Sequence, residues 1–305
     1  MVEGSKIRRL SIGHFPDDCW YLIFKKLGSK HDQDSFGLTC RRFLDIQNSS
    51  VKHLELGCLI KSKCSCYPID PFTIQKLLIR FRELDSLSLG SCNIQVSDSA
   101  LTPLLTNGSK LHYLWLDFCH DITAIGFTLV ASGCPLLSVI SLCKCSITDS
   151  GLEILAKSCS SLTEVNISRC QNITDRGILS LNQNCRQLRT LKLSHCRNIT
   201  GVGFQGFSRT MACLEADHCA FDSTGVTGIL SGGGLRYLNV SCSLKHTRVH
   251  GLTSIGLGLG ANIEVLNLSY CKLLEDDTII KISKGCPVLQ EWNLSYCSKI
   301  AISGW

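Results

Sequence analysis

One spacing of apolar residues recurs from residue 84 to the end of the chain and limits the possible folds more than any other feature. In the stretch 185–203, Leu188, Leu191 and Leu193 are followed by Cys196 and Ile199. The same pattern recurs with a cysteine at Cys92, Cys119, Cys145, Cys170, Cys196, Cys219, Cys242, Cys271 and Cys297. The mean period is about 26 residues, which is typical of stacked repeats that cannot bury their apolar faces alone.

The pattern L-x-x-L-x-L-x-x-C-x-[IL] resembles the leucine-rich repeat. The two leucines of each L-x-L pair are expected to point inward from a short parallel strand, with the cysteine packed after the strand and a helix on the outer face. Thr or Asp of the I-T-D step that follows, as at 147–149, is expected to supply the N-cap oxygen of that helix. We therefore predict an α/β fold: an open horseshoe solenoid with parallel strands on its concave face and helices outside.

Two places depart from the repeat. The cysteine spacing shortens between 196 and 242, and the segment 244–250 is an insertion rich in Lys, Arg and His. The last repeat stops at Trp305 without a helix or polar cap, so we expect either a shortened form or an end that a partner covers.

The N-terminal quarter has a different organisation. Residues 15–27 carry one apolar stripe after Pro16 and two aspartates, which predicts a first helix. We expect a polar turn over 28–34, a second helix over 35–46, and a further helix over 71–81. The predicted divisions are a flexible lead-in at 1–14, a helical module at 15–50, a linker with an irregular first repeat at 51–83, and regular repeats at 84–305.

The stretches F-P-D-D-C-W-Y-L-I-F-K-K-L and D-S-F-G-L-T-C-R-R-F resemble an F-box, although the usual Leu-Pro start is Phe15-Pro16 here. An F-box followed by cysteine-type repeats is the layout of the leucine-rich F-box family, whose members are substrate receptors of SCF-type ubiquitin ligases. The resemblance implies that the F-box binds the small adaptor subunit and, through it, a cullin. The implied adaptor-binding or packing residues are Phe15, Pro16, Trp20, Ile23, Leu27 and Phe43.

Charge and cysteine usage restrict the partners and the compartment. The net charge is +6, but residues 84–305 hold 17 Lys and Arg against 16 Asp and Glu, which argues against nucleic-acid binding. No apolar stretch of membrane-spanning length and no signal-peptide pattern occurs, so we expect no membrane partner. Most of the 20 cysteines are phased with the repeats, which favours a ladder of reduced, buried thiols over disulfides or metal ligands. A cytosolic or nuclear location is therefore expected.

No catalytic motif is present: we find no G-x-S-x-G, P-loop or H-E-x-x-H sequence. His195 and His218 could serve as bases, but positions on a solenoid surface explain them more simply. We therefore expect no enzymatic activity, no cofactor and no metal.

The strand positions between the inward leucines are predicted to face the concave side, and the residue before each phased cysteine is predicted to lie where the strand ends. Aromatic and charged side chains at such positions favour protein recognition. The predicted substrate-binding residues are Tyr113, Trp115, Asp117, Phe118, Arg169, Lys192, His195, Glu215, Asp217, His218, Tyr270 and Tyr296.

The sequence thus predicts a substrate-recognition subunit that holds an unidentified protein on its repeats and performs no chemistry itself. Two alternatives remain open at this stage. One is an interaction scaffold without ubiquitin transfer, and the other is a small-molecule receptor of the hormone-sensing kind.

Overall fold

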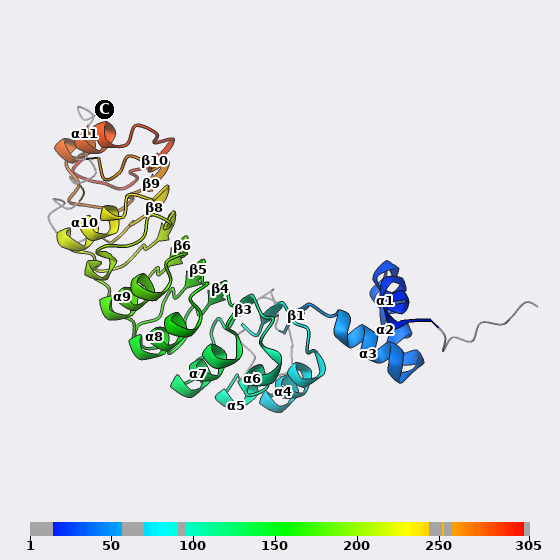
Figure 1. Cartoon of the computed structure of the whole chain (residues 1–305). Coiled ribbons are helices and arrows are strands. Elements are labelled where there is room, and N and C mark those ends of the chain that lie inside the picture. Colours follow the sequence, from blue (N-terminus) through cyan, green and yellow to red (C-terminus); the bar gives the residue numbers. More distant parts are fainter. Residues whose placement is uncertain (1–14, 57–69, 91–95, 244–251, 253–257, 302–305) are drawn as a thin grey trace, which may run out of the picture.

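The computed structural model describes residues 15–56, 70–90, 96–243, 252 and 258–301 (Figure 1). The lead-in 1–14, the phased Cys92, the insertion 244–250 and the end at Trp305 lie outside these ranges, so the predictions made for them are not tested.

Ten short parallel strands form one open sheet in which each strand pairs with its neighbours in chain order. The register repeats without a shift, so that Leu191 lies between Val165 and Leu214. The strands are β1 (His53–Glu55), β2 (Ser86–Ser88), β3 (Tyr113–Trp115), β4 (Val139–Ser141), β5 (Glu164–Asn166), β6 (Thr190–Lys192), β7 (Cys213–Glu215), β8 (Tyr237–Asn239), β9 (Val265–Asn267) and β10 (Glu291–Asn293).

Helices lie along the other side of the arc from the strands (Figure 1). They are α4 (Pro71–Arg80), α5 (Asp98–Leu101), α6 (Leu104–Asn107), α7 (Ala124–Gly133), α8 (Asp149–Ser158), α9 (Asp175–Asn184), the 3-10 turn η2 (Val202–Phe204), α10 (Ser223–Ser231) and α11 (Asp276–Gly285). One continuous apolar core runs between the two layers. The predicted leucine-rich-repeat solenoid is therefore confirmed.

The aspartate of the I-T-D step caps the next repeat rather than its own. The threonine of the step caps its own helix at Thr174, whose Oγ1 accepts from Arg176 N at 3.2 Å, but not at Thr148. Asp149 Oδ1 accepts from the backbone N–H of Thr174 and Gly177, at 2.8 and 3.1 Å. Asp98 and Asp175 cap their following repeats in the same way. Each aspartate therefore joins two repeats on the outer face and neutralises the positive end of the next helix.

Within the described ranges, the phased cysteines are free thiols, and all of them except Cys242 are buried. All cysteines in the described ranges are free, and the thiols of Cys170 and Cys196 donate to Leu142 O and Ile167 O of the preceding repeat, at 3.0 and 3.1 Å. Burial raises the pKa of Cys196 to about 11 and that of Cys170 to about 12. The ladder of reduced thiols predicted from the period is present.

The predicted register was wrong by one residue in a single repeat. Cys242 is only half-buried, and Ser243 occupies the inward position, where its hydroxyl donates to Ala216 O at 2.7 Å. Ser243 also lies three residues after the buried Val240, which is the spacing found in every other repeat. A cysteine next to the true position produced the error.

The N-terminal module contains three helices, α1 (Asp17–Lys26), α2 (Lys30–Thr39) and α3 (Arg41–Ser50), at one end of the arc (Figure 1). The predicted turn over 28–34 and single helix over 35–46 are therefore wrong. Ser29 starts α2 early by accepting from Asp32 N at 3.0 Å, and Cys40 ends it in an extended conformation (φ −160°, ψ 166°). The module has its own core, centred on Phe24, Phe43 and Ile46.

No helix in the described part of the chain is both long and apolar enough to span a bilayer.

Replacing Ser243 with Ala is expected to lower the free energy of unfolding by about 1–3 kcal/mol, because the buried N–H of Cys219, which donates to the Ser243 hydroxyl, loses its acceptor. The matched change of the neighbouring Cys242 to Ala should alter stability by no more than about 0.5 kcal/mol. Denaturant unfolding of both variants measures the difference. A larger loss of stability in the Cys242 variant than in the Ser243 variant would indicate that Cys242 occupies the inward position.

Iodoacetamide at about pH 8 is expected to modify the exposed Cys40 in the native protein and to leave Cys170 and Cys196 unmodified, because burial keeps these two as protonated thiols. Peptide-resolved mass spectrometry measures the labelling, with protein in concentrated guanidinium as the control in which every cysteine reacts. Equal native labelling of Cys196 and Cys40 would contradict the buried ladder.

Candidate functional site

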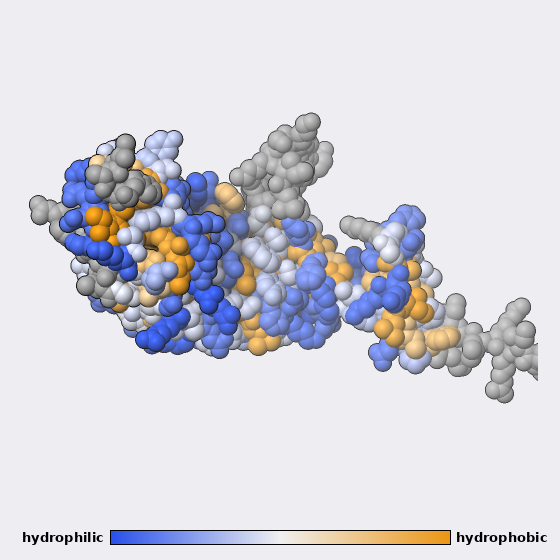
Figure 2. Space-filling view, turned by 90° about the horizontal axis from the view of Figure 1, so that it is seen from above, coloured by the Kyte–Doolittle hydropathy of each residue, from blue (hydrophilic) through white to orange (hydrophobic). Residues whose placement is uncertain are grey.

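The helical module exposes apolar side chains that lie outside its own core. Phe15 and Ile23 are 42% and 44% exposed, and Leu22 and Leu38 are exposed to 64% and 85%. Figure 2 shows hydrophobic atoms on the visible face of this module. Exposed apolar groups of this size are typical of a protein-binding surface.

The six residues predicted for adaptor binding divide into two groups. Phe15, Pro16 and Ile23 lie on the surface. Trp20 and Leu27 are half-buried, and Phe43 is buried; together they pack in or against the core of the module. Sequence reasoning missed Leu22 and Leu38. Both are apolar residues that lie outside the buried stripe of their helix. This can be recognised in the sequence only once the helix boundaries are known.

A second surface forms where the strands end. Among the described residues, the non-glycine residues with positive φ all lie immediately before the inward residue of a repeat, and we call them the exit row. They are Phe118, Lys144, Arg169, His195, His218, Cys242, Tyr270 and Tyr296, with φ between 57° and 64°. The sequence placed seven of the eight at the strand ends but gave no sign of their conformation.

Seven of the eight exit-row residues, all but Tyr296, are fixed by a backbone hydrogen bond to the next repeat. The backbone N–H of Lys144 donates to Ser168 O at 2.8 Å, and that of Arg169 donates to Ser194 O at 2.7 Å. A left-handed conformation costs a non-glycine residue about 1–2 kcal/mol, and here it recurs in successive repeats. The backbone beneath this row of side chains is therefore closely specified.

Neighbouring exit-row side chains contact one another. The rings of His195 and His218 stack with centroids 4.2 Å apart. Tyr270 and Tyr296 stack at 4.4 Å, and Lys144 Nζ lies 5.3 Å from the ring centroid of Phe118. The row is thus aromatic at both ends and cationic between them.

The predicted strand-face residues divide between contact surface and structural roles. Tyr113 and Trp115 stack in parallel with centroids 6.1 Å apart, and Lys192 forms an ion pair with Glu215 at 3.2 Å. Asp117 instead accepts hydrogen bonds from Ser141 Oγ and Cys143 N at 2.5 and 2.8 Å. Its carboxylate holds the following repeat, which leaves less of it for a partner.

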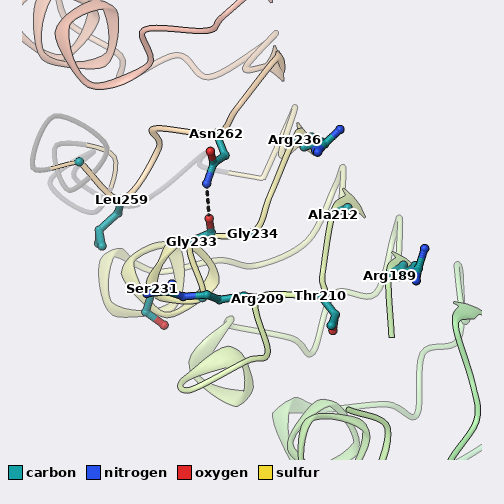
Figure 3. Close-up of a pocket in the computed structure, with 12 residues that line it drawn as sticks. Arg189, Arg209, Thr210, Ala212, Ser231, Gly233, Gly234, Arg236, Leu259 and Asn262 are labelled. Atoms are coloured by element: carbon teal, nitrogen blue, oxygen red, sulfur yellow. Dashed lines mark hydrogen bonds between the residues drawn. The ribbon is translucent and has the colours of Figure 1, made fainter. Parts of the chain in front are cut away.

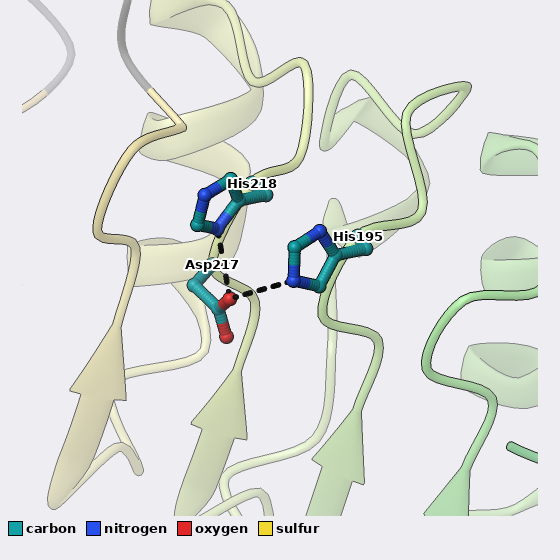
Figure 4. A group of neighbouring side chains, drawn as sticks. All are labelled: His195, Asp217 and His218. Atoms are coloured by element: carbon teal, nitrogen blue, oxygen red, sulfur yellow. Dashed lines mark hydrogen bonds and ion pairs between the residues drawn. The ribbon is translucent and has the colours of Figure 1, made fainter.

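Asp217 holds the two histidines together (Figure 4). Its Oδ2 lies 3.0 Å from His218 Nδ1 and 3.7 Å from His195 Nε2, and its Oδ1 accepts from the Ser194 hydroxyl. Burial opposes the charge of Asp217, but these hydrogen bonds outweigh it and lower its pKa. Burial, then the charges of His218 and Arg169, lower the pKa of His195.

The same three groups are the one set in the described ranges with ligand atoms close enough to hold a metal ion, within 4.8 Å of one another. Two features favour a hydrogen-bonded network instead. Both oxygens of Asp217 already accept hydrogen bonds, and the positive charges of Arg169 and Arg197 act on His195. The network orients two imidazole rings on the surface.

Two cavities lie on opposite edges of the sheet. One, of about 840 Å³, lies where strands begin and is lined by Arg189, Arg209 and Arg236 around a glycine-rich turn (Figure 3). Asn262 Nδ2 donates to Gly233 O within it, at 2.8 Å. The other, of about 600 Å³, lies along the exit row between Lys144 and His195. The second cavity alone includes residues predicted to bind a substrate.

Comparison with solved structures supports the fold. An internalin from Listeria monocytogenes is similar with a TM-score of 0.55 and 24% identity, over 74% of this chain and 62% of that chain. The structure of a Rad7 and Elc1 complex in yeast gives a TM-score of 0.53 and 13% identity, over 95% of this chain and 90% of that one. At these identities the likeness concerns the fold alone.

Sequence comparisons identify the family. The family model for Leucine Rich repeat matches residues 158–181 and 184–208. The rice protein Coronatine-insensitive protein homolog 1b is 25% identical, over 55% of this chain and 39% of its own length. F-box/LRR-repeat protein 12 of Arabidopsis thaliana is 48% identical over 296 residues, which cover 95% of this chain and 75% of that protein. The chain therefore belongs to the family of F-box proteins with leucine-rich repeats.

Proposed function

We propose that this protein is the substrate-recognition subunit of an SCF-type ubiquitin ligase. Its F-box module would bind the adaptor subunit, which links it to a cullin, and its repeats would hold a target protein. The protein itself performs no chemical step: it brings a target close to a separately recruited ubiquitin-conjugating enzyme and so raises the effective concentration of target lysines.

One observation supports the proposal: the chain exposes apolar side chains on one core and a row of aromatic and cationic side chains on another. The exposed Leu22, Ile23 and Leu38 belong to the helical module, whose core is built around Phe24 and Phe43. The exit row belongs to the solenoid and its continuous core. Two surfaces of this kind suit a protein that joins a ligase to a target.

The compartment is part of the same proposal. A cytosolic or nuclear location agrees with the free cysteines of the solenoid, since buried thiols persist in reducing compartments.

The double substitution Ile23→Asp, Leu38→Asp is expected to weaken adaptor binding by roughly tenfold or more, because each exposed apolar contact would be replaced by a charge. Affinity purification with the purified adaptor measures the loss. Both side chains are exposed, so the module should keep its fold and thermal transition.

A matched control is Ile125→Asp on helix α7, where the isoleucine is 66% exposed; adaptor binding should be unchanged. Retention of the adaptor by the double variant would contradict the assignment of the F-box surface. Recovery of the adaptor without a cullin from the wild-type protein would favour an interaction scaffold instead of a ligase subunit.

A further inference from the structure

The residues that line the cavity on the exit row are rich in cations and include no acid. Its lining includes Lys144, Arg169, Arg197, His120 and His195, and it includes no Asp or Glu. By contrast, Lys192 on the neighbouring strand face is paired with Glu215. Within the described ranges, none of Lys144, Arg169 and Arg197 forms an ion pair, so their charge is available to a ligand.

The cations are arranged along a line by the repeat itself. Lys144, Arg169 and His195 occupy the same exit-row position after β4, β5 and β6, and Arg197 follows two residues later in the third repeat. Neighbouring parallel strands are about 4.8 Å apart, so the three positions span about 10 Å. That length matches about three residues of an extended peptide, at about 3.3 Å each.

The backbone beneath these side chains is held in place before any ligand binds. Gln171 Nε2 donates to His195 O at 2.9 Å across two repeats, and Asn198 Nδ2 donates to Gln171 O at 2.7 Å. These bonds add to the inter-repeat bonds of the exit row. A preorganised row of donors loses less conformational entropy when it binds than a flexible one.

The local field agrees with this charge distribution. Burial is the largest cause that lowers the pKa of His195, and the charges of His218, Arg169 and Arg197 lower it further against the opposing charge of Asp217. Burial and these charges together favour the neutral imidazole, and two of the charges, on Arg169 and Arg197, belong to residues that line the cavity. An anion in the cavity would relieve this repulsion.

Resting on the substrate-receptor function proposed above, we infer that this cavity between Lys144 and Arg197 binds a short anionic segment of the substrate protein. The groups recognised are oxyanions, supplied either by neighbouring carboxylates or by a phosphorylated side chain. Arg169 and Arg197 offer planar guanidinium groups that suit both kinds of oxyanion. A peptide is favoured over a nucleic acid because the cations occupy three repeats only and the repeat region is nearly neutral.

The test uses the full chain and three fluorescent peptides of one length and one background sequence. One carries three consecutive glutamates, the second carries a single phosphoserine at the central position, and the third carries glutamines. Fluorescence anisotropy is expected to show that at least one anionic peptide binds roughly tenfold or more tightly than the glutamine peptide. The arm that binds identifies the source of the oxyanion.

The variant Arg169→Gln, Arg197→Gln should lose most of this preference, with affinity for the bound peptide falling roughly tenfold or more. The matched control Arg189→Gln, Arg209→Gln removes the same charge from the cavity on the opposite edge, and it should leave the affinity unchanged. Thermal transitions of the two variants within about 2 °C of each other exclude a folding defect.

The assignment of this cavity would be overturned if the glutamine peptide bound as tightly as the anionic peptides. It would also be overturned if the control variant lost as much affinity as the Arg169→Gln, Arg197→Gln variant. Tighter binding of a single-stranded oligoribonucleotide than of either anionic peptide would overturn it as well. Adaptor purification with the same variant separates this inference from the function proposed above: loss of the peptide with retention of the adaptor supports both. Peptide binding by a wild-type protein that does not bind the adaptor would contradict the ligase role alone.

Discussion

The structure depends on the burial of each repeat's apolar face by its neighbours. Leu191 and Leu193 are fully buried, yet a single repeat consists of one three-residue strand and one short helix, which cannot enclose them. Leu191 therefore packs between Val165 and Leu214 of the adjacent strands. Every inward position has this requirement. The need to bury inward side chains between adjacent repeats therefore determines both the period of the sequence and the register of the sheet.

Two sets of polar contacts between repeats keep the stack in that register. On the outer face, Asp149 and Asp175 cap the helix or turn of the following repeat. A Cβ on Gly177 would lie 2.6 Å from Asp149 Oδ1, so a glycine is required where that carboxylate approaches. At the edge where the strands end, the N–H groups of seven exit-row residues bond to the next repeat. Both sets of bonds fail if a repeat slips by one residue.

The sequence predicted the parts of the fold that follow from spacing alone. It predicted the parallel strands, the inward leucines and the thiol ladder, because each follows from a repeat of about 26 residues. It misplaced Cys242 because residue type was given more weight than distance from Val240. It missed the break at Cys40, and it read 28–34 as a turn although Ser29 caps a helix that starts at Lys30.

The candidate site was predicted in position but not in conformation or charge balance. The residue before each inward cysteine was correctly expected at the strand end. Its left-handed backbone was not foreseen, since Phe118 and Arg169 carry no signal for positive φ in a single sequence. The pairing of Asp217 with His195, and the absence of an acid from the cavity lining around Arg169, depend on neighbours about one repeat away. Contacts of that kind require the stack to be known.

The exit-row conformation also explains which residues the row contains. A left-handed backbone strongly disfavours β-branched side chains, and none of the eight positions holds Val, Ile or Thr. The side chains project away from the core. In seven of the eight positions the backbone N–H is hydrogen-bonded to the next repeat. Residue identity here is therefore constrained by the turn but not by packing. The solenoid can vary long aromatic or cationic groups along this edge without disturbing the stack that supports them, which suits a surface that must match a particular partner.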